Sequence, residues 1–229
     1  DCKKEIDSDL PFSDLMSLYV DKIPNGRRKL ICKIKERFDY ISSLEMSNNT
    51  NSNSLAIAGN LSLGKSPYIY KLIEHKLDYK LNLFGPYFDE TMELDDRIEY
   101  FGSFKPDELP GKLEGKFGLV WDGDSIDTCS GSTGNYLRYN NPHKTSLYLT
   151  AGIPVIIWKE AAMAKFIEKH KAGILVESLT EIDDVINNIS DSDYTELKNN
   201  AIQIGMQLRN GYYYKKALQE CIENANSDR

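Results

Sequence analysis

The sequence predicts an α/β fold with a doubly wound parallel sheet over residues 55–229. Short apolar runs alternate along this stretch with segments of helical character, which is the pattern of repeated strand–helix–strand units. The runs at 117–121 and 153–158 are almost continuously apolar, as expected for strands that are buried on both faces. Prolines and glycines also stand where helices are expected to begin and end.

The expected elements follow one another along the chain. The first strand is 55–58, and a helix begins at Pro67 with Ser66 as its N-cap. Further strands are expected at 79–84, 98–102, 117–121, 153–158 and 174–176, with a short helical turn at 106–109. Helices are expected at 145–151, 159–171, 179–189, 193–208 and 212–225, and we expect the first of these to end at Gly152 and the second at Gly173.

The composition argues against several classes of protein. The formal net charge is −7, which disfavours a general nucleic-acid surface and leaves local clusters of lysine and arginine as the expected anion sites. No apolar run approaches the ~20 residues of a membrane-spanning helix, so we expect no stable membrane insertion, and no signal peptide is recognisable. The four cysteines are scattered, which is typical of a cytoplasmic protein without a disulfide framework or a zinc ribbon.

Residues 1–54 differ from the rest of the chain. They are charged and weakly patterned, with a candidate helix at 11–20, a basic run at 27–35 and a loop rich in Asn and Ser at 47–54. We interpret them as an amino-terminal segment, either a remnant of a missing domain or a linker to it, because a domain needs ~100–150 residues. The basic run is expected to be an amphipathic surface segment, and a patch for a membrane surface or an acidic partner is the alternative.

The polar stretch before the strand at 153–158 is the expected functional centre. Asn141 followed by Pro142 predicts a helix start, with Asn141 as the N-cap. Lys144 lies in the first turn of that helix, where free backbone amides and the positive end of the helix dipole favour an anion such as a phosphate or diphosphate. The alternative is an ordinary helix start with a solvated lysine. A cation and two aromatic rings precede this start: Arg138, Tyr136 and Tyr139.

A second candidate anion site follows the first strand. Ligands of doubly wound sheets bind beyond the carboxyl ends of the strands, where the loops 59–66, 122–141 and 159–162 are expected. The first of these loops carries Gly59, Asn60 and Lys65, and it leads into a helix. Lys65 and Lys144 would therefore face one crevice, and two cations with two helix N-termini suit a diphosphate better than a single phosphate.

Three aspartates, Asp122, Asp124 and Asp127, follow the strand at 117–121. They could hold a divalent metal, but their spacing is looser than that of a typical calcium or magnesium loop, so we expect no metal. Asp122 and Asp124 could instead bind sugar hydroxyls, or the loop could be solvated and held by Asx turns. Neither a P-loop nor the Gly-x-Gly-x-x-Gly fingerprint is present, and the absence of the fingerprint argues against a dehydrogenase.

Several motifs, taken in order, resemble one family. They lie at 58–62, 65–69, 83–86, 100–104, 106–110, 118–123, 136–144 and 151–156, and the most specific is Asn-Asn-Pro-His-Lys at 140–144. Together they resemble the bacterial GT-B glycosyltransferases known as galactofuranosyltransferases or nucleotide-sugar-synthetase-like proteins. That group includes the glucosyltransferase that extends GlcNAc on serine-rich-repeat adhesins. The resemblance covers about residues 55–225.

The resemblance implies a Rossmann-like domain, the carboxy-terminal half of a GT-B enzyme. Such a domain binds a UDP-sugar, here UDP-glucose or UDP-galactofuranose, and serves transfer of the sugar to a glycan or glycoprotein acceptor. GT-B enzymes generally need no metal, and no cofactor is implied. By this resemblance Lys144 and the helix start at Asn141 hold the diphosphate, Lys65 is a second basic residue for it, and Tyr139 lies at the nucleotide.

The resemblance also implies roles for the last third of the chain. The loop that carries Lys159 and Ala161 would border the donor sugar or the uracil, and the helix at 212–225 would resemble the helix that crosses back toward the amino-terminal domain. The catalytic base of such enzymes usually belongs to that other domain, so we name none. The alternatives are a non-catalytic module that binds or assembles around nucleotide sugars, and a structural domain with a vestigial anion site. Apolar surface on the truncated side would favour a homo-oligomer.

Overall fold

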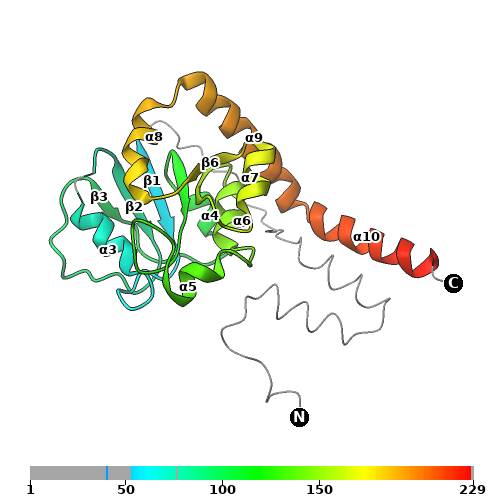
Figure 1. Cartoon of the computed structure of the whole chain (residues 1–229), viewed down its shortest axis with the longest axis horizontal. Coiled ribbons are helices and arrows are strands. Elements are labelled where there is room, and N and C mark those ends of the chain that lie inside the picture. The colour runs from blue at the N-terminus through cyan, green and yellow to red at the C-terminus, as the bar shows by residue number, and fades with distance from the viewer. Residues whose placement is uncertain (1–39, 41–52, 76, 228–229) are drawn as a thin grey trace, which may run out of the picture.

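The computed structural model describes residues 40, 53–75 and 77–227. The predictions for residues 1–45 and for most of the loop at 47–54 lie outside them. The centre of the fold is a parallel sheet with the strand order β3-β2-β1-β4-β5-β6 (Figure 1), which confirms the doubly wound, Rossmann-like sheet. The strands are β1 (Ser54–Ala58), β2 (Lys80–Phe84), β3 (Ile98–Tyr100), β4 (Phe117–Val120), β5 (Val155–Trp158) and β6 (Gly173–Val176). They match the predicted strands to within about two residues at each end.

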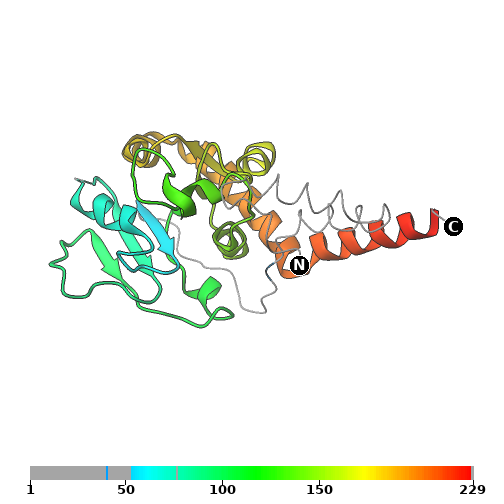
Figure 2. The same ribbon diagram turned by 60° about the horizontal axis from the view of Figure 1, so that its bottom comes forward.

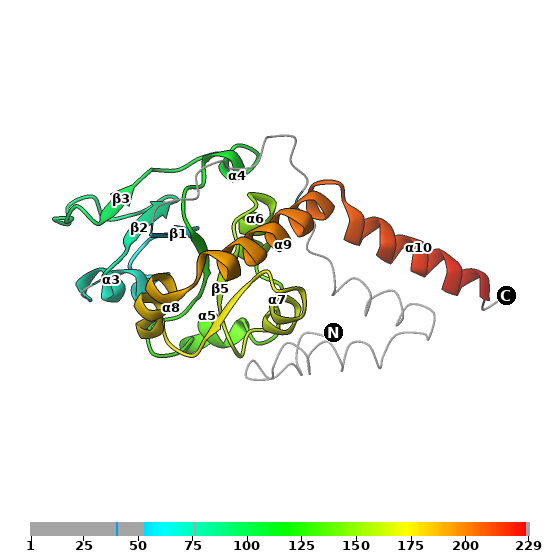
Figure 3. The ribbon, with the colours of Figure 1, turned by 90° about the horizontal axis from the view of Figure 1, so that it is seen from above.

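Helices flank the sheet on both sides, as the view from above shows (Figure 3). The last helix projects away from the body of the molecule (Figure 2). No helix of the described part is long and apolar enough to cross a membrane. The helices are α3 (Pro67–Glu74), α4 (Leu109–Lys112), α5 (Gly131–Tyr136), α6 (His143–Thr150), α7 (Ala164–His170), the 3₁₀ turn η1 (Leu179–Glu181), α8 (Ile182–Asn188), α9 (Asp191–Arg209) and α10 (Tyr212–Ser227).

The core lies on both faces of the sheet because its central strands are apolar throughout. Every residue of β1, β4 and β5 is buried, as expected for parallel strands covered by helices. Trp121 follows β4, Trp158 is the last residue of the neighbouring β5, and both side chains are fully buried. Their rings meet edge to face with 6.5 Å between centroids, a favourable aromatic geometry.

Tyr148 of α6 ties this helix to the first strand. Its hydroxyl oxygen accepts a hydrogen bond of 2.7 Å from the buried amide of Ala58. Its ring fills the space that Gly118 leaves, because a Cβ on that glycine would lie 2.2 Å from the ring. The carboxyl end of β1 is therefore held by α6, which also packs on the neighbouring strand β4.

Tyr148→Phe is expected to lower the free energy of unfolding by about 1–3 kcal/mol, because the buried amide of Ala58 loses its acceptor. Urea denaturation measures this difference. The matched control is Tyr212→Phe at the start of α10, where the exposed side chain should leave stability unchanged. A Tyr148→Phe variant as stable as the wild type would show that the hydroxyl contributes nothing to holding β1.

The predicted start of α6 was wrong by one residue. The helix begins at His143, and the N-cap is Pro142, whose ψ of 133° is extended rather than helical. Asn141 is therefore not the N-cap. The extended ψ of Pro142 places this residue outside the helix, which accounts for the later start. The predicted end is confirmed, because Gly152 follows the helix with a φ of 71°.

The predicted helix at 159–171 began too early, and Gly173 does not terminate it as predicted. α7 begins at Ala164, because the preceding residues form a loop in which the amide of Ala162 donates to the carbonyl of Leu137 at 2.8 Å. The helix ends at His170, and its C-cap Lys171 takes the left-handed conformation with a φ of 47°. Gly173 instead opens β6, where a Cβ would lie 2.1 Å from the backbone oxygen of β5.

Candidate functional site

The strand order reverses between β1 and β4, and the two loops that leave these strands meet at this point. The first begins with Gly59, whose φ of 139° is a conformation that favours glycine. The second begins with Trp121 and Asp122, directly after β4. In doubly wound sheets, chain connections on either side of such a reversal run to opposite faces and leave a crevice between them.

The side chain of Lys144 lies between these two loops, at the expected crevice. Its Nζ donates to the carbonyl of Trp121 at 2.9 Å and lies 3.6 Å from a carboxylate oxygen of Asp122. It also lies 5.8 Å from the centre of the Tyr68 ring. On the other side, the Cε atom of Lys144 would be 3.4 Å from a Cβ at Gly59. The fold thus brings together three residues that the sequence singled out: Gly59, Asp122 and Lys144.

Lys144 and Asp122 form an ion pair where the two loops meet. Each of the two side chains is 19% exposed, so both charges are largely withdrawn from water and depend on each other.

Burial raises the pKa of the Tyr68 hydroxyl well above its ordinary value, and the charge of Asp122 raises it further. Burial likewise raises the pKa of Cys129 to about 12. Tyr68 and Cys129 therefore stay neutral at physiological pH.

The loop between β1 and α3 is held by its own hydrogen bonds. The side-chain oxygen of Asn60 accepts from the amide and the hydroxyl of Ser62, at 2.9 and 2.8 Å. Ser66 is the N-cap of α3 as predicted, but its hydroxyl donates to the carbonyl of Asn60 at 2.8 Å and does not cap the helix. Lys65 is exposed on this loop, and its approach to the crevice of Lys144 stays a prediction.

The loop between β4 and α6 contains α5, a helix that was not predicted from the sequence. Before it, Asp124 accepts from the hydroxyl of Ser130, and Asp127 accepts from the hydroxyl of Ser125 at 3.2 Å. These two aspartates serve the loop itself, whereas Asp122 faces the lysine of the crevice. Within the described residues, no group of three or more acidic, histidine or cysteine side chains could hold a metal ion.

Arg138 and Lys159 both have acidic partners. The guanidinium of Arg138 lies 4.5 Å from the centre of the Trp158 ring and forms an ion pair with Glu160. Lys159 forms an ion pair with Glu177, which follows β6. The sequence could not show these pairs because their members belong to different loops. A role of either cation in ligand binding stays a prediction. The cation would have to contact the ligand while it keeps the ion pair with its glutamate.

Three further candidates lie on the loops around α6 and α7. Tyr139 and Asn141 are half-buried, and Ala161 is buried. The backbone bond from Ala162 to Leu137 joins the loop after β5 to the segment that leads into α6. The loop at 159–162 is therefore fixed next to the nucleotide segment, residues 137–141, where Tyr139 is expected to contact the nucleotide. The roles proposed for these residues stay predictions.

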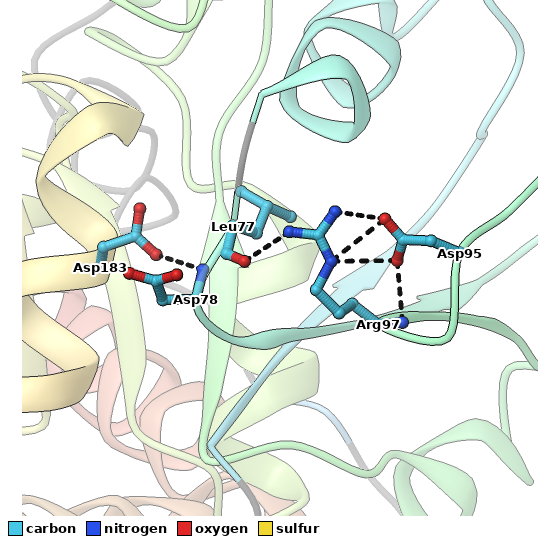
Figure 4. Close-up of polar contacts among 5 residues, drawn as sticks. All are labelled: Leu77, Asp78, Asp95, Arg97 and Asp183. Carbon is cyan, nitrogen blue, oxygen red and sulfur yellow. Dashed lines mark hydrogen bonds and ion pairs between the residues drawn. The ribbon is translucent and has the colours of Figure 1, made fainter.

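A second polar cluster lies at the other end of the sheet, where β2 and β3 begin (Figure 4). Arg97 forms an ion pair with Asp95 and donates to the carbonyl of Leu77 at 2.5 Å. Nearby, the carboxylate of Asp183 accepts from the amide of Asp78 at 2.8 Å. These bonds fix the starts of two strands and tie α8 to them. Because each of these contacts holds chain segments together, we interpret the cluster as structural.

The sequence matches a known family over most of its length. Residues 55–221 match the family model described as glucosyltransferase 3-like, C-terminal domain. The chain is 37% identical over 217 residues to the beta-1,6-galactofuranosyltransferase WbbI of Escherichia coli (strain K12). This alignment covers 91% of this chain and 61% of that protein. It is 29% identical over 143 residues to glucosyltransferase 3 of Streptococcus gordonii, covering 62% of this chain and 41% of that protein. The chain therefore spans less than two thirds of the length of either relative.

Solved structures share the fold at low sequence identity. The pneumococcal O-GlcNAc transferase GtfA, solved with UDP and GlcNAc, matches with a TM-score of 0.53 and 13% identity over 82% of this chain and 38% of that chain. Anabaena Alr3699/HepE, solved with UDP-glucose, matches with a TM-score of 0.50 and 18% identity over 77% of this chain and 49% of that chain. These matches agree with the predicted fold class, a Rossmann-like doubly wound sheet.

Proposed function

The chain belongs to the family of glucosyltransferase 3-like C-terminal domains, and from this premise we propose that it is the donor-binding domain of a hexosyltransferase. It would bind UDP-glucose or UDP-galactofuranose and serve transfer of the hexose to a glycan or glycoprotein acceptor. The relatives named above, a galactofuranosyltransferase and a glucosyltransferase, support this class of reaction. The proposal involves neither a metal nor an organic cofactor.

The position of Lys144 is the observation that carries the proposal. This lysine lies in the first turn of α6, a helix of eight residues, and its side chain reaches the point where the strand order reverses. A helix N-terminus with an added ammonium suits a diphosphate. Gly59 has no Cβ and so leaves room beside the lysine. We assign Lys144 and Asn141 to the diphosphate, with Lys65 as a second cation.

The remaining candidates are assigned around this centre. Tyr139 would contact the nucleotide, and the loop with Lys159 and Ala161 would border the sugar or the uracil. Gly59, which has no side chain, would let the ligand approach the backbone closely, Asn60 would lie beside the ligand, and Asp122 would orient Lys144. Arg138 would fix the nucleotide segment against β5, because it lies on Trp158.

The geometry suggests how the domain would assist transfer. The bond between the sugar and the diphosphate breaks while the acceptor oxygen bonds to the sugar, so negative charge develops on the departing UDP. A fixed ammonium and helix N-terminus at that position would stabilise this charge as it develops. The acceptor hydroxyl must also lose a proton, and we assign no residue of the described part to accept it.

Thermal unfolding with UDP, UDP-glucose, ADP and NAD tests the proposal. A ligand that binds only the native state stabilises it by RT ln(1 + [L]/Kd), which is about 2.7 kcal/mol at a ligand concentration of 100 Kd. We expect UDP and UDP-glucose to raise the melting temperature and ADP and NAD to leave it unchanged. No shift with either uridine nucleotide would contradict the proposal. UDP binding without any hexose transfer to a supplied acceptor would favour the non-catalytic binding module.

Two further assignments belong to this proposal. We place the protein in the cytoplasm, because its four cysteines are scattered along the sequence and do not form the pattern of a disulfide framework. We also propose self-association through the exposed apolar side chains at the end of α9 and along α10, because patches of this kind often mark interfaces. Light scattering would show a mass above that of one chain, and a monomer at high concentration would contradict it. These side chains include Met206, Tyr212, Leu218 and Ile222.

A further inference from the structure

Tyr87 has a backbone conformation that bulky residues rarely adopt. Its φ is 68°, in the left-handed region. Lys171, the other non-glycine residue with a positive φ in the described part, ends α7, where such a residue commonly terminates a helix. Tyr87 ends no helix. It follows Gly85 and Pro86 in the loop after β2, at a backbone position that glycine or asparagine would adopt with less strain.

Packing does not offset the strain at Tyr87. Its side chain is 71% exposed, although it is a large aromatic residue. A non-glycine residue in a sparsely populated backbone region lowers the stability of the fold, and such strain clusters at ligand-binding sites. Glycine or asparagine would fit this backbone position with less strain. The ring is therefore kept in solvent at the expense of stability, which points to a role outside the folded core.

The loop that carries Tyr87 is fixed against the loop after β1. The amide of Leu61 donates to the carbonyl of Pro86 at 3.0 Å. Gly85 approaches Gly59 so closely that a Cβ on Gly85 would lie 1.8 Å from the carbonyl oxygen of Gly59. The loop after β2 can therefore move little relative to the loop that borders the crevice of the candidate diphosphate site.

The two loops also lie at a suitable separation for one nucleotide. Neighbouring strands are roughly 5 Å apart, and β2 pairs directly with β1. The Cε atom of Lys144 lies 3.4 Å from the position that a Cβ on Gly59 would take, at the end of β1. A nucleotide whose diphosphate lies at Lys144 can extend its ribose across the end of β1 and place its base over the loop after β2. An exposed aromatic ring there offers a flat apolar face.

We propose that Tyr87 is a stacking platform for the uracil ring of the donor nucleotide. This inference rests on the proposed function, because it requires a UDP-sugar with its diphosphate at Lys144. Stacking on an aromatic side chain contributes substantially to the binding of a base. The backbone of the loop that carries the ring is already fixed, so little backbone freedom is lost on binding, which favours affinity.

Titration calorimetry with UDP and with inorganic pyrophosphate tests the inference on four proteins: the wild type, Tyr87→Phe, Tyr87→Gly and Tyr87→Asn. We expect the glycine and asparagine variants to bind UDP about 5- to 100-fold more weakly, because they lack the ring. The phenylalanine variant keeps the ring and should bind UDP as the wild type does. Pyrophosphate has no base, so its affinity should be the same in all four.

Thermal unfolding of the same variants separates a binding role from a structural one. Because the strain is relieved, the glycine and asparagine variants should melt at or above the temperature of the wild type. Unchanged UDP affinity in these variants would overturn the stacking role and leave the proposed function standing. Loss of pyrophosphate affinity or a lower melting temperature would show a structural role for Tyr87 and would also overturn it. A wild type that binds no UDP would overturn the proposed function together with this inference.

Discussion

Lys144→Met is expected to weaken UDP binding by about 10- to 100-fold, the effect of losing a charge-assisted hydrogen bond to a phosphate. Methionine keeps most of the length of the side chain and removes its charge, so the loss would report the ammonium itself. Calorimetric titration with UDP measures the change. The matched control is Lys169→Met, which removes an exposed lysine from α7 and should leave UDP affinity unchanged. Wild-type affinity in Lys144→Met would contradict the placement of the diphosphate.

The same variant should also lose stability, because it leaves the carboxylate of Asp122 partly buried without its cation. The double variant Lys144→Met/Asp122→Asn removes both charges and should regain part of the lost stability. UDP binding should remain weak in the double variant, since the ammonium is still missing. Urea denaturation and calorimetry on the two variants thus separate the contribution of Lys144 to folding from its contribution to binding. No recovery of stability would show that the pair does not carry the effect.

Gly85→Ala is expected to lower the free energy of unfolding by about 3 kcal/mol or more, because it combines a strained backbone with an overlap of atoms. The φ of Gly85 is 144°, and an added Cβ would lie 1.8 Å from the carbonyl oxygen of Gly59. The loop after β1 would have to move, so UDP binding should weaken as well.

Gly64→Ala is the matched control for this change. Gly64 lies on the neighbouring loop, and nothing is within 4 Å of the position that a Cβ would take. We expect its stability to stay within about 1 kcal/mol of the wild type. Urea denaturation of both variants measures the difference. If Gly85→Ala were as stable as Gly64→Ala, the two loops would not be packed against each other as the structure has them.

The sheet could be predicted from the sequence because its buried strands are short apolar runs, each visible in the sequence by itself. The end of α6 could also be predicted, because a glycine directly after a helix is a local signal. The helix α5 could not be predicted, because its Gly, Ser and Thr residues have poor helical propensity. It packs against the segment that precedes it in the same loop, where a Cβ on Gly134 would lie 2.6 Å from the backbone of Cys129. Such close packing leaves no local pattern in the sequence.

The candidate site was predicted in part, for a related reason. Lys144 and Gly59 follow from the rule that ligands bind beyond the carboxyl ends of parallel strands, and the structure places them together. The bond from Lys144 to the carbonyl of Trp121 involves a backbone atom, which no side-chain pattern reveals. The ion pair of Arg138 with Glu160 joins two loops that are distant in sequence. Tyr87 is strained through its backbone angle, and a tyrosine in the sequence gives no sign of that.

The most direct test of the central claim is a titration of the isotope-labelled protein with UDP, followed through the chemical shifts of its backbone amides. Binding at the proposed site should shift the amides of Gly59, Asn60, Asp122 and Lys144 in proportion to its occupancy. Amides of Asp78 and Arg97, at the opposite end of the sheet, should not respond. Shifts confined to that opposite end, or none at saturating UDP, would contradict a donor site at the carboxyl ends of β1 and β4.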